Sequence, residues 1–243
     1  MVGKITRQFN LILRSGFHYY RMAMVKPPFW ICLRGKCDRV AAEDTLGATT
    51  IYCEVIVEDC YDILGWARSH SPQVIVDIGA NIGLFSQMCS MVFPEAQIYA
   101  YEPHPEALKW LRQNAQNKQI TVVEGAVSSQ SGELRLDLGE DSTIAQVSPM
   151  GQFAVNKVDI ATLAENQEID FLKMDCEGSE WDILQDESLL QRTQFFCLEY
   201  HLSKQQSLAD LKLLIQRGQH QVTRIKPQPG CQDFGVLWSM RQD

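Results

Sequence analysis

The chain reads VIVDIGANIG at residues 74–83, and this stretch decides the fold class. An apolar, β-branched run ends in Asp77, a glycine turn follows, and residues 84–88 continue with a helical apolar pattern. Such a sequence predicts a buried strand that passes through a tight loop into a helix, which is where open α/β sheets bind their ligands.

The acid at the end of this strand indicates the charge of the ligand. A phosphate-binding loop would avoid Asp77, because helix N-termini attract anions and a carboxylate repels them. A ligand with positive charge suits the position, and S-adenosylmethionine carries both an ammonium and a sulfonium. Asn81 also occupies the place of the middle glycine in a Gly-x-Gly-x-x-Gly dinucleotide fingerprint. We expect Gly79 to make the turn and Gly83 to allow close packing of helix and strand, although an ordinary α/β turn with packing glycines has the same pattern.

The next predicted strand, residues 97–102, also ends in an acid. Glu102 lies 25 positions after Asp77 and precedes Pro103. An acid at this spacing accepts hydrogen bonds from a ribose hydroxyl pair. The simpler alternative is a solvated carboxylate at a strand end. Both a nicotinamide cofactor and S-adenosylmethionine fit Glu102, and the missing middle glycine favours S-adenosylmethionine.

Length and composition limit the classes of protein. A chain of 243 residues with 45% hydrophobic residues can bury one full core. It contains no run of eighteen apolar residues, so we expect no membrane span. The net charge of -8 argues against general nucleic-acid binding.

The N-terminal part has a different charge balance. Up to residue 40 the chain holds eight basic residues and one acid. Apolar residues at helical spacing predict an amphipathic helix over residues 1–26 that ends at Pro27-Pro28. We expect it to pack on the core or on a second subunit in a homodimer; the alternative is a basic helix at a membrane surface or over an anionic substrate. The predicted domains are a basic helical extension, 1–45, and a second unit, 46–243.

The eight cysteines contain no Cys-x-x-Cys pair. Arg14 interrupts any signal-peptide core, which argues against export and for a cytoplasmic protein with reduced thiols. A zinc site is the alternative, built from Cys32, Cys37, Cys53 and Cys60.

After residue 70 strands and helices alternate, which predicts an α/β fold with a mostly parallel, doubly wound sheet. We expect ligand and chemistry at the carboxyl ends of the strands. The predicted strands are 73–78, 97–102, 120–125, 169–174, 194–200, 220–225 and 234–239. The predicted helices are 82–93, 104–116, 179–190 and 204–217. An insertion holds candidate strands at 133–138 and 153–158 with a polar loop, 139–152, between them, and residues 50–57 and 59–69 predict a strand and a short helix before the core.

A second group of polar residues follows the predicted strand 169–174. Asp175 ends this strand at the level of Asp77 and Glu102, and Glu177 lies on the loop after it. Glu180 falls in a first helical turn, where an acid stabilises the helix dipole, so we expect a structural role for it. The following strand ends near His201, which the topology could bring to the same cleft; a packed or capping histidine is the alternative.

These residues together resemble the FkbM-type methyltransferases that use S-adenosylmethionine. The resemblance lies in four segments that follow the family order over about residues 50–240: 76–83, 101–105, 125–128 and, most specifically, the Lys-x-Asp-x-Glu-Gly-x-Glu element at 173–180. It implies a seven-stranded Rossmann-like methyltransferase fold whose last strand is inserted antiparallel. It also implies methylation of a hydroxyl on a small-molecule acceptor, often a sugar or a polyketide-type natural product.

Each candidate residue then has an expected role. Asp77 and Gly79 would hold the amino-acid end of the donor and Glu102 its ribose. The other expected cofactor contacts are Ala80, Asn81 and Gly83 in the loop, with Glu124, Gly125 and Ala126 beside the adenine. An alcohol is a poor nucleophile and needs a base or a metal, for which the candidates are Asp175, Glu177 and His201.

Some alternatives stay open at this stage. Asp175 is also the candidate ligand of a divalent metal, and hard oxygen ligands would favour magnesium or calcium. A nicotinamide-dependent oxidoreductase and a non-catalytic binding module on the same scaffold are the other functions compatible with the sequence.

Overall fold

The computed structural model describes residues 26–33, 35–43, 45–129, 134–138, 145–147, 151, 153–176, 179–228 and 230–242. The helix predicted over residues 1–26 lies outside the described residues except for Lys26, as do the membrane and dimer contacts expected of it. In the described ranges, no helix combines the length and the apolar character needed to cross a bilayer.

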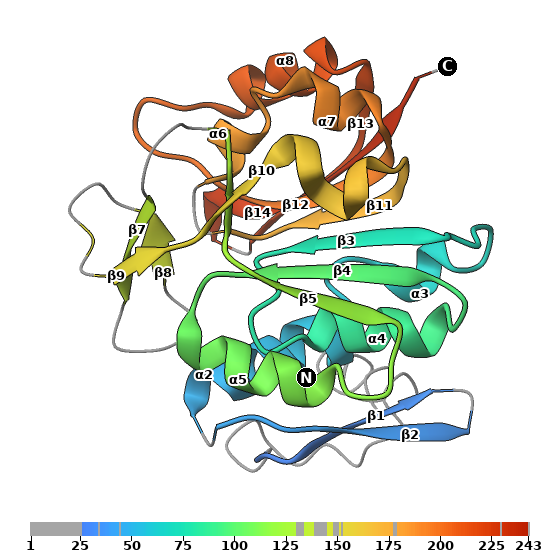
Figure 1. The fold of residues 1–243 in the computed structure, drawn as a ribbon. Helices are drawn as coiled ribbons and strands as arrows, with labels where there is room; N and C mark the ends of the chain where they lie inside the picture. The colour runs from blue at the N-terminus through green and yellow to red at the C-terminus, as the bar shows by residue number, and fades with distance from the viewer. Residues whose placement is uncertain are drawn as a thin grey trace.

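A central sheet of seven strands organises the molecule (Figure 1). Its strand order is β13-β14-β12-β11-β3-β4-β5, and β14 runs antiparallel to both of its neighbours. The pairs from β12 to β5 are all parallel. The prediction of a mostly parallel sheet with an inserted antiparallel strand is therefore confirmed. The bounds are β3 Val74–Ile78, β4 Gln97–Glu102, β5 Ile120–Glu124, β11 Ile169–Met174, β12 Thr193–His201, β13 His220–Gln228 and β14 Cys231–Arg241.

Helices cover both faces of this sheet (Figure 1). Side chains of the strands alternate between the faces, so the core has a part on each face. Ile75 of β3 packs with one cluster, while Val76 and Ile78 pack with the other. This is the period-2 pattern that a strand buried on both faces requires. The first face carries α3 Ile63–Trp66, α4 Leu84–Val92 and α5 Pro105–Asn114; the second carries the 3-10 helix η3 Ile160–Asn166 with α6 Glu180–Ile183, α7 Glu187–Gln191 and α8 Leu208–Arg217.

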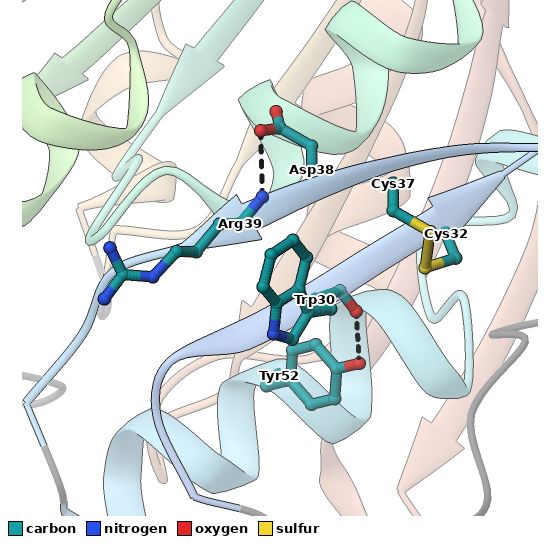
Figure 2. The surroundings of a disulfide bond; sticks show 6 residues. All are labelled: Trp30, Cys32, Cys37, Asp38, Arg39 and Tyr52. Atoms are coloured by element: carbon teal, nitrogen blue, oxygen red, sulfur yellow. Dashed lines mark hydrogen bonds between the residues drawn. A yellow bond between two sulfur atoms is a disulfide. The ribbon is translucent and has the colours of Figure 1, made fainter.

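An N-terminal hairpin lies on the outer side of the helices that cover the first face (Figure 1). Strands β1 Phe29–Leu33 and β2 Lys36–Val40 pair antiparallel, and their inward side chains join the same core cluster as α4. Tyr52 donates a hydrogen bond to the carbonyl oxygen of Trp30 at 2.8 Å (Figure 2). The hairpin therefore shares a core with the rest of the chain, and the division of the chain at residue 45 stays a prediction.

A disulfide joins the two strands of the hairpin. Register places Cys32 directly opposite Cys37, and their sulfur atoms are bonded (Figure 2). The prediction of reduced thiols is wrong for this pair, because hairpin pairing brings the two side chains together. The bond also takes both sulfurs from the alternative zinc site, and among the described residues no group of three His, Cys, Asp or Glu side chains could hold a metal ion.

The segment predicted as a strand over 50–57 is helical instead. Helix α2 Leu46–Tyr52 begins at Thr45, whose side chain accepts a hydrogen bond from the backbone N–H of Ala48, and a π-helix, η2 Cys53–Val57, continues it. β-branched residues favour strands only where a neighbouring strand can pair with them, and here packing against α4 overrides that preference.

Three further predicted elements have different bounds in the structure. The predicted helix 59–69 is shorter and is α3 alone. The predicted helix 179–190 is divided into α6 and α7, because Asp186 caps a new helix by accepting hydrogen bonds from the N–H groups of Ser188 and Leu189. The candidate strand 153–158 breaks at Asn156.

The insertion forms two small sheets. Strand β9 Phe153–Val155 joins β7 Leu134–Leu138 and β8 Ala145–Val147, whereas β10 Lys157–Asp159 pairs with β6 Ala126–Ser128. The region expected to be only a loop, 139–152, thus contains a strand.

One buried amide connects the hairpin to the glycine loop. The Asn114 side chain accepts a hydrogen bond from the N–H of Ala41 at 2.8 Å and donates to the carbonyl oxygens of Ala41 and Ile82 at 2.9 and 2.8 Å. Three backbone groups from two distant segments are satisfied by this side chain.

We expect Asn114→Ala to lower the free energy of unfolding by about 3 kcal/mol, because it leaves buried backbone groups without partners. Urea denaturation followed by circular dichroism measures the change. Gln113→Ala, on the exposed face of the same helix, is the control and should change stability by less than about 0.5 kcal/mol. Equal stability of Asn114→Ala and the control would contradict this role.

Candidate active site

A cavity of about 410 Å³ opens at the carboxyl ends of the central strands. Its floor comes from the glycine loop after β3, the end of β4, the β5–β6 turn and the end of β11. Residues of α2 and η2, together with Cys60 and Tyr61 that follow them, contribute to its wall. The volume lies within the range of small-molecule sites, and the position agrees with the expectation for an open α/β sheet.

The structure brings most of the predicted site residues to this cavity. Those that line it are Gly79, Ala80, Asn81, Glu102, Gly125, Ala126 and Asp175. Those that do not are Asp77, Gly83, Glu124 and His201. Glu177 lies outside the described residues.

Gly79 allows the loop after β3 to lie very close to the end of β11. Its φ is +74°, and a Cβ built there would lie 1.7 Å from the carbonyl oxygen of Asp175. No side chain fits, so glycine is required for the ends of β3 and β11 to meet. At Gly83, φ is +86° and a Cβ would lie 2.6 Å from Cδ1 of Leu111, so this residue lets α4 approach α5 rather than a strand.

Glu102 lies at the end of β4 and is almost fully buried. Its two carboxylate oxygens accept hydrogen bonds from the backbone N–H groups of Asn81 and His104, each at 2.7 Å. Burial raises the pKa of Glu102 to about 7, although the two N–H donors act in the opposite direction. The carboxylate thus fixes the glycine loop against β4 and still has lone pairs that can accept from a ligand.

Asp77 is wholly buried and does not line the cavity. Its carboxylate forms an ion pair with Nζ of Lys173 at 3.1 Å and accepts a hydrogen bond from the hydroxyl of Ser86 at 2.6 Å. Asp77 therefore lies beside Lys173, and its expected contact with the donor stays a prediction.

Lys173 is the central cation of the site, and sequence reasoning assigned it no role. Its Nζ donates to the carbonyl oxygen of Gly79 at 2.7 Å and lies 3.7 Å from Oδ2 of Asp175. Burial lowers the pKa of Lys173, but Asp77 and Asp175 outweigh burial and the net pKa is raised, so the lysine is charged. The sequence did contain an indication of this role: a lysine inside a mostly apolar, buried strand needs a partner of opposite charge.

Asp175 has a second partner that the sequence did not indicate. Tyr61 donates a hydrogen bond to Oδ2 of Asp175 at 2.9 Å, and its ring packs edge-on against Phe85. Burial is the largest influence that raises the pKa of Tyr61, so it stays a hydrogen-bond donor. Lys173 and Tyr61 thus hold one oxygen of a carboxylate that faces the cavity.

The other candidates lie farther out. Nε2 of His201 is 3.7 Å from Oε1 of Glu199, which does line the cavity, whereas His201 does not. Glu124 pairs with Arg112 on the surface at 2.6 Å. Glu180 is buried and accepts from the N–H of Cys176 at 2.8 Å, which agrees with the structural role predicted for it.

Comparison with known proteins identifies the family. Residues 77–222 match the family described as Methyltransferase FkbM domain. Methyltransferase sdnD from Sordaria araneosa is 30% identical over 192 residues, which cover 61% of this chain and 73% of the relative. Hexuronic acid methyltransferase AglP from Haloferax volcanii is 30% identical over 145 residues, which cover 55% of this chain and 58% of the relative.

A solved structure shares the fold. Magnesium protoporphyrin IX methyltransferase from Synechocystis PCC 6803, with bound SAH, aligns with a TM-score of 0.52 and 10% identity over 99% of this chain and 95% of that chain.

The raised pKa of Glu102 predicts a specific pH dependence of stability. The folded protein holds this proton up to about pH 7 and the unfolded chain releases it near pH 4.5, so stability is highest at low pH and falls as pH rises through 7. Between pH 5 and pH 8 we expect this group to cost roughly 2–3 kcal/mol.

Urea denaturation at both pH values measures this cost as the difference between the wild type and Glu102→Gln. Glu95→Gln, at an exposed position, is the control and should follow the wild type. Parallel pH profiles for the wild type and Glu102→Gln would show that Glu102 is ionised throughout.

Proposed function

The chain belongs to the FkbM family of methyltransferases, and on that premise we propose that it transfers a methyl group from S-adenosylmethionine to a hydroxyl of a sugar or natural-product acceptor. One observation carries the proposal: the glycine loop, Glu102 and Asp175 converge on a single cavity. The cavity therefore offers a nucleoside-binding carboxylate and a candidate base in one space.

The donor side is formed by the ends of β3, β4 and β5. Glu102 would accept hydrogen bonds from the ribose hydroxyls with the lone pairs that Asn81 and His104 leave open. Gly125 and Ala126 would flank the adenine, since both line the cavity beyond the end of β5. The fold relative from Synechocystis, which was solved with SAH, supports this choice of donor.

The residues at the end of β11 would handle the acceptor. Bound S-adenosylmethionine would supply an electrophilic methyl group, whose bond to the sulfonium sulfur breaks as the acceptor oxygen attacks in line and S-adenosylhomocysteine leaves. Asp175 would take the proton of the acceptor hydroxyl as the oxygen–methyl bond forms. Tyr61 and Lys173 fix one oxygen of this carboxylate, so the other is the one available to the acceptor. Holding the reactants in line and excluding water supplies the rest of the rate enhancement.

Calorimetry at pH 8, where Glu102 is ionised, tests the donor. We expect the wild type to bind S-adenosylmethionine and not NAD, and Glu102→Ala to weaken donor binding by about 1.5–3 kcal/mol, the value of hydrogen bonds to a charged group. Tight NAD binding would instead favour an oxidoreductase. An unchanged dissociation constant in a folded Glu102→Ala variant would remove Glu102 from the ribose site.

Transfer of a labelled methyl group tests the chemistry. The protein is incubated with labelled donor and with sugar and natural-product acceptors, and the labelled product is identified. We expect Asp175→Asn to slow transfer about 10²–10⁴-fold while the donor dissociation constant stays near that of the wild type. Donor binding without transfer to any acceptor would favour a non-catalytic binding module, and a fully active Asp175→Asn variant would place the base elsewhere.

A further inference from the structure

The ammonium group of the proposed donor is stabilised best by a carboxylate, and the carboxylate expected for it does not face the cavity. Asp77 is wholly buried, does not line the cavity and is already paired with Lys173. A second cation beside this carboxylate would have to displace Lys173, which also holds the carbonyl oxygen of Gly79. Another carboxylate that faces the cavity would suit the ammonium better, because it offers an opposite charge without displacing Lys173.

Four described carboxylates line the cavity, and three of them already have partners within the protein. Glu102 accepts from two backbone N–H groups. Asp175 interacts with Tyr61 and Lys173, and Glu199 lies 3.7 Å from His201. Among the described residues, no hydrogen-bond donor or cation is paired with the fourth, Glu54.

The local structure holds Glu54 in the cavity wall. It is the exposed residue of the π-helix η2, whose other members, Cys53 and residues 55–57, are buried in the core. Its own carbonyl oxygen accepts a hydrogen bond from the N–H of Cys60, so the backbone turns back directly after η2. π-helical turns are rare and occur often at functional sites. This segment also lies before the residues that match the family, 77–222.

The electrostatics at Glu54 favour a cation. Partial burial of its carboxyl group is the largest influence that raises the pKa of Glu54, and the neighbouring carboxylates of Asp175 and Glu58 raise it further. Each of these influences disfavours the ionised form, and a bound ammonium would offset them. The donor ammonium supplies such a charge together with three N–H donors.

We propose that Glu54 binds the α-ammonium group of the methyl donor, in the place that the sequence assigned to Asp77. The inference rests on the proposed function, because it assumes that S-adenosylmethionine occupies this cavity. Glu54 would then bind the amino-acid part of the donor, while Glu102 would bind its ribose.

A pair of ligands isolates this contact without any acceptor. S-adenosylhomocysteine carries the amino-acid group, and 5′-methylthioadenosine has the same nucleoside and thioether but no ammonium. We expect Glu54→Gln to weaken S-adenosylhomocysteine about 10-fold in calorimetry at pH 8 and low salt, and to leave methylthioadenosine unchanged. Glu102→Gln should weaken both ligands, because both carry the ribose.

Two variants on the same segment make the test specific. Glu58→Gln removes a carboxylate four residues away that does not line the cavity, and it should bind both ligands like the wild type. Glu54→Asp keeps the charge on a shorter side chain and should weaken S-adenosylhomocysteine less than Glu54→Gln does. An equal loss for both ligands, or no loss for either, in a folded Glu54→Gln variant would overturn the assignment of Glu54. Failure of the wild type to bind either ligand would instead overturn the proposed donor.

Discussion

A buried lysine between two strand ends is the interaction on which the site depends. Lys173 contacts Asp77 on β3, Asp175 at the end of its own strand and the carbonyl oxygen of Gly79 in the loop. Taking a lysine and an aspartate out of water costs several kcal/mol per ion, and only good geometry with further hydrogen bonds offsets it. The carbonyl of Gly79 and the hydroxyl of Ser86 supply those bonds. Loss of one partner would leave the other as an uncompensated buried charge, so this group is more a constraint on geometry than a source of stability.

This constraint explains why the loop can carry no side chain at its first position. Lys173 draws the loop after β3 toward the end of β11, where the N–H of Asp175 also donates to the carbonyl oxygen of Ile78 at 3.1 Å. At this separation only a residue without Cβ fits at Gly79. Glu102 fixes the opposite side of the loop through the N–H of Asn81. The backbone that faces the cavity is thus held from two neighbouring strands, so a ligand meets a preformed surface.

The sequence predicted the parts of the structure that depend on local pattern. Strands β3, β4 and β11 lie within a residue of their expected bounds, because buried apolar runs that end in an acid and a turn are unambiguous. The strand predicted over residues 50–57 was wrong because this β-branched run packs beside α4 and becomes helical. The local sequence gives no indication of that packing. The ion pair of Asp77 depends on Lys173, 96 positions later in the chain, and the Cys32–Cys37 bond depends on the register of a hairpin. Such pairings between distant residues cannot be read from periodicity.

The charge of the cavity also bears on which nucleotide it suits. Of the described residues that line it, Glu54, Glu102, Asp175 and Glu199 are acids, and Lys173 alone is basic. Lys173 forms an ion pair with Asp77, which lies outside the cavity, and this pair largely offsets the positive charge that a ligand would meet. A pyrophosphate would bring two further negative charges into this space, where the low dielectric strengthens repulsion. A sulfonium and an ammonium meet attraction from the same carboxylates, so the side chains on the cavity wall favour S-adenosylmethionine over a dinucleotide independently of the glycine spacing.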